Sequence, residues 1–177
     1  MKFKEYLKNN WVSLVIKVSI IVVCLVADLV TKSVMSRVFN ERFSAGEYEN
    51  INVIKGVLSF TYTENTGAAF SMMSSRTIFL TVFSAVFIVV FVCLDYSFKN
   101  KSAWSAVGFG LIVAGAMGNL VDRLFLQYVR DFICFDFLGT FPICNFADVC
   151  ITVGCAIYAI YFIVHEIKVA RKAKHEN

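Results

Sequence analysis

The sequence predicts an all-α membrane protein with four transmembrane helices and a small extramembrane β-sheet. Of the 177 residues, 58% are hydrophobic and only 17% are charged, whereas charged residues make up about 25% of a soluble domain. Four apolar stretches each approach the ~20 residues that a membrane-spanning helix requires. The basic residues flank these stretches in clusters, which is typical of cytoplasmic ends. We therefore expect a single membrane domain over residues 1–177, with both termini in the cytoplasm.

The four spanning helices are predicted at residues 11–31, 77–94, 102–121 and 148–165. Lys17 lies close enough to the start of the first helix to snorkel toward the headgroups. That helix has a basic start, but no small-x-small cleavage site follows, so we expect it to remain uncleaved. Small residues recur at every fourth position of the third helix, which favours close helix packing in lipid. These are Ala106, Gly110, Ala114 and Gly118.

A segment of about residues 40–70, between the first two helices, is predicted to hold the β-structure. In GVLSFTYTEN the residues Leu58, Phe60 and Tyr62 alternate with Ser59, Thr61 and Thr63. This period of two is typical of a half-buried strand. We expect a small sheet on the extracytoplasmic face of the membrane.

Polar residues gather at one predicted membrane edge, where helices and the strand end. They are Asp28, Lys32, Asn65, Thr66, Asn119, Asp122, Arg123, Asp131, Asn145 and Asp148. Each also has an ordinary interpretation: Asp28 with Lys32 forms a structural ion pair, Asp148 caps a helix, and Asp136 faces water. The convergence of so many polar groups on one face favours a functional site.

The residues that are absent from the sequence restrict the chemistry. Both histidines, His165 and His175, belong to the predicted cytoplasmic end, which excludes a Ser–His triad or a histidine zinc site at the outer edge. No HExxH, Walker or Rossmann pattern occurs, so we expect neither a metal nor a cofactor. The net charge of +4 requires no nucleic-acid partner. Carboxylates remain, and two aspartates that share a water can hydrolyse a peptide.

Three other functions remain open at this point. A transporter would use Asp28 as its intramembrane carboxylate, but the middles of the last three helices are uncharged, and transporters place polar groups near the bilayer midplane. A non-catalytic assembly subunit would pack through the stripe of small residues. A serine–lysine protease would use Lys32 with Ser33, although nothing positions that pair across a substrate.

Five motifs resemble those of the lipoprotein signal peptidase family, the signal peptidase II family of bacterial membrane aspartic proteases. They are DLVTK at 28–32, NTGAAFS at 65–71, GNLVDR at 118–123, VRDF at 129–132 and NFAD at 145–148. Each motif alone is weak. Their common order and spacing, over nearly the whole chain, make the resemblance specific.

The resemblance implies a function and a set of site residues. It implies an aspartic endopeptidase of the bacterial cytoplasmic (inner) membrane that removes signal peptides from diacylglyceryl-modified prolipoproteins, cleaving before the lipid-modified cysteine. Asp131 and Asp148 would be the catalytic pair. The supporting residues would be Asp28, Lys32, Asn65, Gly67, Asn119, Asp122, Arg123, Asn145 and Ala147. The implied partners are membrane lipid and a globomycin-type cyclic peptide inhibitor, and we expect a monomer.

Two residues depart from the family pattern. Leu29 replaces the usual glutamine, and Arg130 replaces a small apolar residue. Strand alternation predicts that the Arg130 side chain turns away from Asp131. Cys134 and Cys144 are the cysteines that we place outside the membrane, and whether they form a disulfide is left open.

The predicted pair has a simple electrostatic consequence. Two carboxylates ~4 Å apart repel by ~4 kcal/mol at an effective dielectric constant of about 20. That corresponds to about 3 pKa units, so both are not ionised together near neutral pH and one proton is shared.

Overall fold

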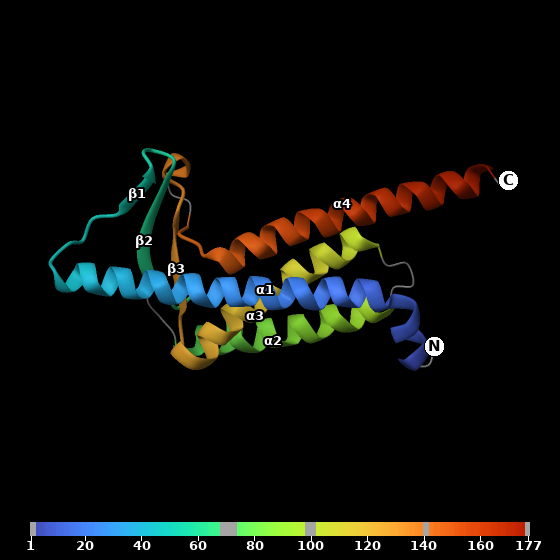
Figure 1. The fold of residues 1–177 in the computed structure, drawn as a ribbon, viewed down its shortest axis with the longest axis horizontal. Coiled ribbons are helices and arrows are strands. Elements are labelled where there is room, and N and C mark those ends of the chain that lie inside the picture. Colours follow the sequence, from blue (N-terminus) through green and yellow to red (C-terminus); the bar gives the residue numbers. More distant parts are fainter. Residues whose placement is uncertain (1–2, 68–73, 98–101, 140–141, 176–177) are drawn as a thin grey trace.

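The computed structural model describes residues 3–67, 74–97, 102–139 and 142–175. Four long helices form the body of the molecule, and three short strands form an antiparallel sheet near one end (Figure 1). In chain order the elements are α1 (Phe3–Ser44), β1 (Ile51–Ile54), β2 (Leu58–Asn65), α2 (Ser74–Ser97), α3 (Ala103–Leu126), β3 (Val129–Cys134), the 3-10 helix η1 (Asp136–Leu138) and α4 (Phe146–His175). This confirms the predicted fold class of four apolar helices with a small sheet.

Each of the four helices is long and apolar enough to cross a membrane. The central helix is α3, which packs against the other three. Of its most apolar stretch 67% is buried, against 6% for α2. Apolar side chains therefore cover the outer surfaces of α1, α2 and α4, while buried polar groups such as Asp28 and Asp122 lie inside. This arrangement suits a bundle surrounded by lipid.

Glycines let α3 approach its neighbours closely. A Cβ atom at Gly115 would lie 2.3 Å from the carbonyl oxygen of Ala147, at the start of α4. A Cβ atom at Gly118 would lie 2.3 Å from Oδ2 of Asp28 on α1. The small residues of α3 thus form two contact faces, and the contact at Gly118 brings α3 directly against the polar residues of α1.

The structure corrects the predicted start of the β-segment. Residues 40–44 are helical, because α1 continues to Ser44 and β1 begins only at Ile51. Phe39, which is 2% exposed, stacks on Tyr62 of β2 with ring centroids 6.3 Å apart. These aromatic contacts give the end of α1 a packing surface beyond its lipid-facing part. At the other end of the chain, α4 runs from Phe146 to His175, beyond the predicted 148–165.

The prediction that Lys17 snorkels is wrong. Lys17 is 4% exposed, forms an ion pair with Asp95 of α2, and its Nζ lies 4.5 Å from the ring centroid of Phe109. A buried partner charge and an aromatic face hold the ammonium group inside the bundle.

The sheet has the order β1-β2-β3 and stands across the end of the bundle (Figure 1). Phe60 of β2 packs edge-to-face on Phe132 of β3. The expectation that Asp136 faces water fails here. Asp136 is half-buried, because the hydroxyl of buried Ser59 donates to Asp136 Oδ1 at 2.7 Å.

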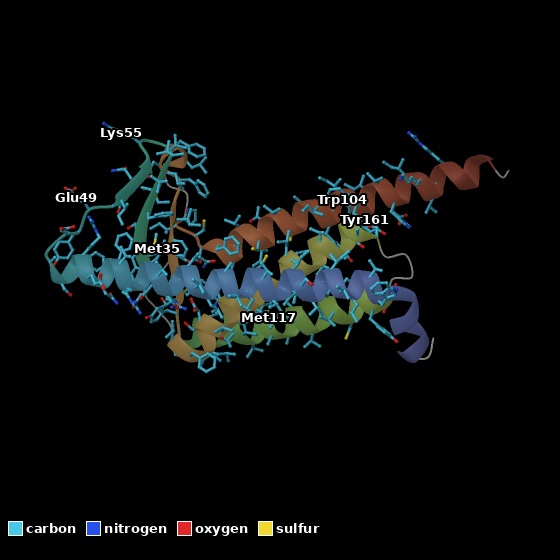
Figure 2. All side chains as sticks on the ribbon, viewed as in Figure 1. Met35, Glu49, Lys55, Trp104, Met117 and Tyr161 are labelled. Atoms are coloured by element: carbon cyan, nitrogen blue, oxygen red, sulfur yellow. The ribbon has the colours of Figure 1, made fainter. Side chains whose placement is uncertain are left out.

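The two ends of the molecule differ in what they carry. Lys55 marks the tip of the sheet, whereas Trp104 and Tyr161 lie toward the opposite end, on α3 and α4 (Figure 2). The start of α1 and the end of α4 lie at that same opposite end (Figure 1).

Candidate active site

Asp131 and Asp148 are brought together by a short backbone contact between β3 and the residues before α4. The Cys144 carbonyl accepts hydrogen bonds from the N–H groups of Phe132 and Ile133, at 2.9 and 2.7 Å. The Cys144 N–H donates to the Ile133 carbonyl at 3.0 Å. The first turn of α4, which contains Asp148, is therefore fixed beside the strand that contains Asp131.

Asp131 is a buried carboxylate held by two amide side chains. It is 1% exposed, and its Oδ1 accepts from Asn145 Nδ2 at 2.6 Å. Its Oδ2 accepts from Asn65 Nδ2 at 2.8 Å. Burial raises the pKa of Asp131 to about 6; the two amide hydrogen bonds oppose this shift, and the negative charge of Asp148 adds to it. Asp131 can therefore hold a proton at a pH where an exposed aspartate cannot.

Asp148 occupies the first turn of α4 and takes part in a reciprocal cap with Asn145. The Asp148 N–H donates to Asn145 Oδ1 at 3.0 Å, and the Asn145 N–H donates to Asp148 Oδ2 at 3.2 Å. This is the geometry of a capping box. The other oxygen, Oδ1, accepts from Asn119 Nδ2 at 2.8 Å. The capping alternative is thus realised in the structure, together with a second contact toward the site.

Asn145 and Asn119 connect the two carboxylates. Asn145 is fully buried, and its Nδ2 donates both to Asp131 and, at 3.0 Å, to Asn119 Oδ1. With its backbone N–H on Asp148, Asn145 bonds to both aspartates. The sequence placed Asn119 and Asn145 in a supporting role, and the structure places them between Asp131 and Asp148.

Asp28, Lys32 and Asp122 form a second buried cluster next to the first. Lys32 Nζ lies 2.8 Å from Asp28 Oδ2 and 3.5 Å from Asp122 Oδ2, and it donates to Asn119 Oδ1 at 3.0 Å. The contact with Asp28 is an ion pair with poor hydrogen-bond angles. Asp28 Oδ1 also accepts from the N–H of Ala147 at 2.9 Å. These contacts tie α1 to both α3 and α4.

The two arginines of the site have different partners. Half-buried Arg123 interacts electrostatically with Asp148, Asp131 and Asp122. Arg130 turns away from Asp131, as strand alternation requires, and its Nη2 lies 2.7 Å from Asp122 Oδ1. Asp122 directly precedes Arg123 in the chain, but the arginine that hydrogen-bonds to it is Arg130. The alternation along β3 directs Arg130 and Asp131 to opposite faces, but it does not indicate which carboxylate Arg130 meets.

Gly67 orients the third amide of the site. Its N–H donates to Asn65 Oδ1 at 2.8 Å, which leaves the Asn65 NH2 group free to face Asp131. Gly67 has a φ of +77°, a backbone conformation that residues with a side chain adopt only with strain, and a Cβ atom there would also displace the end of the Leu80 side chain. The rest of this motif, residues 68–71, lies outside the described residues. Nothing in the structure explains the leucine at position 29.

Both extramembrane cysteines are free thiols. Burial raises the pKa of Cys144 to about 11, and the charges of Asp148 and Asp131 add to the shift. A thiol that keeps its proton is a poor nucleophile, so Cys144 serves here through its backbone. Sequence reasoning missed this backbone role.

The chain is similar to proteins of a known family. The family model described as "Signal peptidase (SPase) II" matches residues 20–164. A lipoprotein signal peptidase of Enterococcus faecalis is 39% identical over 135 residues, which cover 76% of this chain and 81% of that protein. One of Clostridium tetani is 38% identical over 154 residues, covering 85% and 93%.

Solved structures show the same fold. One, described as a bacterial membrane enzyme structure at 1.9 Å resolution, superposes with a TM-score of 0.70 at 27% identity and covers 82% of this chain and 91% of its own. A second, at 2.3 Å resolution, superposes with a TM-score of 0.67 at 27% identity, covering 83% and 87%. The matched residues include parts of α1 and α4, all of α2 and α3, and both aspartates, so this chain belongs to the signal peptidase II family of membrane proteases.

Proposed function

We propose that this chain is an aspartic endopeptidase that removes the signal peptide from diacylglyceryl-modified prolipoproteins, cleaving before the lipid-modified cysteine. The relatives are lipoprotein signal peptidases, and the observation that carries the catalytic assignment is the bridging position of Asn145. This residue donates from its side chain to Asp131 and from its backbone to Asp148. Two carboxylates bonded to one residue are suited to act on one water molecule.

The mechanism follows from a shared proton. The ionised aspartate takes a proton from water as the water oxygen attacks the scissile carbonyl carbon. The protonated aspartate donates its proton toward the carbonyl oxygen, which stabilises the tetrahedral intermediate. When the intermediate collapses, the C–N bond breaks and the pair delivers a proton to the leaving amine. The raised pKa of Asp131 makes this residue the holder of the shared proton in the proposed mechanism.

The supporting residues fix the pair and provide contacts for the substrate. Asn65, Asn119 and Asn145 donate to carboxylate oxygens and so leave limited freedom of rotation to either carboxyl group. The guanidinium group of Arg123 is close enough to both aspartates to interact electrostatically. We expect it to bind the substrate backbone near the cleavage site.

The substrate reaches this site through the bilayer. Leu124 and Phe125, which follow Arg123 at the end of α3, are 53% and 80% exposed. A signal helix and a diacylglyceryl chain are both apolar, and they favour an apolar surface within lipid. We propose prolipoprotein and membrane lipid as the partners, inhibition by a globomycin-type cyclic peptide, no nucleic-acid partner and a monomeric enzyme.

We place the protein in the bacterial cytoplasmic membrane with both termini in the cytoplasm and the site outside. The start of α1 and the end of α4 share one end of the bundle, opposite the sheet (Figure 1). Reporter fusions after Ser97 and after His175 should read cytoplasmic, and a fusion at Glu47 should read extracytoplasmic. A cytoplasmic signal at Glu47 would put the aspartates on the wrong side for this function.

The decisive experiment is cleavage by the purified enzyme. A prolipoprotein whose lipobox cysteine carries diacylglycerol should be cut, and the mass of the product should show that it begins with the modified cysteine. The same precursor without lipid should remain intact. Cleavage at another bond, or equal cleavage of both precursors, would contradict the proposed specificity.

A further inference from the structure

The Arg130 side chain lies on the face of β3 opposite to Asp131 and hydrogen-bonds to Asp122 of α3. Its Nη2 donates to Asp122 Oδ1 at 2.7 Å and its Nε to Oδ2 at 3.2 Å. Its backbone N–H donates to the same Oδ2 at 3.0 Å. One residue thus occupies both oxygens of a carboxylate that is 1% exposed. A guanidinium fork of this kind fixes orientation and also neutralises charge.

Asp122 also competes for Lys32. The Lys32 ammonium lies 3.5 Å from Asp122 Oδ2, but 2.8 Å from Asp28 Oδ2 and 3.0 Å from Asn119 Oδ1. Its longest contact is therefore with the carboxylate that Arg130 already neutralises. Because Asp122 is satisfied by the arginine, the lysine stays with Asp28 and Asn119.

The position of Lys32 determines which way the Asn119 amide points. Asn119 Oδ1 accepts from Lys32 and from Asn145 Nδ2, while its Nδ2 donates to Asp148. The flipped amide would set its NH2 group against two donors and its oxygen against a carboxylate, leaving buried groups unsatisfied. The lysine therefore keeps the NH2 group on Asp148.

We propose that Arg130 is a positioning residue for the aspartate pair: by neutralising Asp122 it keeps Lys32 on Asn119, and thereby keeps the Asn119 NH2 group on Asp148. This inference rests on the proposed pair, but it does not depend on the substrate. Without Arg130, Asp28 and Asp122 would share one cation. The buried negative charge beside the pair would grow, Lys32 would be drawn from Asn119, and both changes favour the protonated form of the pair.

Other charged and titratable groups face the pair or Arg130 from every element around them. They are Asp28, Lys32, Arg37, Glu41, Tyr62, Glu64, Asp122, Arg123 and Cys144. Each is left unchanged in the single Arg130 variants, so a shift in those variants reports the arginine itself.

The test compares Arg130→Met, Arg130→Lys and the double variant Asp122→Asn/Arg130→Met. The readout is the pH at which Asp131 loses its proton, followed without substrate by the infrared absorption of the protonated carboxyl, with Asp131→Asn as the blank. Arg130→Met should raise this pH by about one unit, the effect of one uncompensated charge nearby. It should also lower kcat by about tenfold and leave KM nearly unchanged, since the group lost acts on orientation. Arg130→Lys keeps the charge without the fork and should shift the pH less.

The double variant separates an effect through Asp122 from any other. With asparagine at position 122 no carboxylate is left unpaired, so the pH should return close to the wild-type value. Arg37→Met is the matched control, because Arg37 lines the same polar groove as Arg130 and carries the same charge. It should leave both the pH and kcat unchanged.

Several outcomes would overturn the positioning role. The first is an unchanged titration pH of Asp131 in folded Arg130→Met. The second is an equal shift of that pH in Arg37→Met. The third is a double variant in which that pH still lies a full unit above the wild-type value. Should Arg130→Met fail to fold, the double variant and Arg130→Lys decide the question by the same readout. If the titration pH of Asp131 shifts in Arg130→Met but the wild-type enzyme cleaves no prolipoprotein, the positioning role is supported and the proposed function is contradicted.

Discussion

Two pairs of aspartates lie at the same edge of this bundle, and their partners differ. Asp28 and Asp122, each 1% exposed, bind cations: Lys32 lies 2.8 Å from the first and Arg130 2.7 Å from the second. Asp131 and Asp148 are held instead by the amide groups of asparagines. The comparison shows one residue type with cationic partners in one cluster and amide partners in its neighbour, the cluster to which we assign proton transfer.

The physical reason is the effect that each kind of partner has on the proton affinity of the carboxylate. A neighbouring cation favours the ionised form of a carboxylate, and an ion pair of this kind ties helices together. An amide donor orients the carboxylate but compensates its charge less. Burial can then raise the proton affinity, as it does for Asp131. Each prediction below tests a part of this distinction.

The largest expected effect is the loss of cleavage in Asp131→Asn and in Asp148→Asn. Asparagine has nearly the same shape as aspartate, but it can neither take the proton of water nor share one. Each change should therefore lower kcat by at least about 100-fold while the protein stays folded in the membrane. Product formation at matched protein levels in detergent measures this.

Two features of the structure make this prediction specific. An asparagine at 148 can still accept the Asn145 N–H and maintain the cap, so a role in capping alone predicts little loss of activity. Asp136 bonds to Ser59, on another part of the sheet, and Asp136→Asn should stay near wild-type activity. Near-complete loss in Asp136→Asn, or high activity in Asp148→Asn, would refute the assignment.

The second prediction concerns two buried lysines at different places along α1. Lys32→Met and Lys17→Met each remove a cation from beside a buried carboxylate, Asp28 or Asp95, and each should destabilise the fold by about 3 kcal/mol or more. Only Lys32→Met should also lower the rate of the folded enzyme, by roughly tenfold, because Lys32 bonds to Asn119 and the group lost orients the site. Thermal unfolding together with kcat per folded enzyme separates the two effects. Equal rate losses in both variants would show that stability alone matters.

Sequence patterns predict the parts of this molecule that composition and spacing determine. Long apolar runs predict four helices because lipid leaves few other solutions for the backbone. The stripe of small residues in the third run predicts close packing, which Gly110 and Gly118 show. The motifs, read through the family resemblance, predicted the positions of both aspartates and of the asparagines beside them.

The sequence could not show which charges pair across the fold. Lys17 looks like a snorkelling lysine until Asp95, far along the chain, is placed beside it. Arg130 similarly finds Asp122 only once β3 turns back along the end of α3. The extension of α1 to Ser44 depends on aromatic contacts with the sheet. In each case the deciding contact joins segments that no local pattern links.

The third prediction is a pH dependence with a defined sign. Because the pKa of Asp131 is raised from 3.8 to about 6, the folded protein holds more protons than the unfolded chain between these values. Stability should therefore decline as the pH rises across this window, and Asp131→Asn should flatten the decline. Thermal unfolding in detergent across this pH range measures it. Stability that rises with pH through the window, and loses that rise in Asp131→Asn, would contradict a raised pKa.

The same proton sets the alkaline limb of activity. In the free enzyme, kcat/KM should fall by several-fold as the pH rises and the pair loses its shared proton. The midpoint of this fall should lie well above the pKa range of ordinary aspartates. A bound signal peptide excludes water and disfavours a second negative charge, so the limb of kcat should lie at higher pH than that of kcat/KM. Limbs at the same pH would show that the substrate does not cover the pair.

The smallest expected effect is that of removing metal ions. In the described part of the chain, no three His, Cys, Asp or Glu side chains are grouped as a metal site, and the carboxylates nearest the reaction already bond to asparagines. EDTA and serine-directed reagents should therefore leave the cleavage rate within experimental error. Globomycin should block it, because a cyclic peptide that occupies the apolar approach excludes the signal helix. Loss of activity in EDTA that zinc restores would overturn the aspartate mechanism, because the water would then be activated by a metal and the amide-held pair would serve as its ligands.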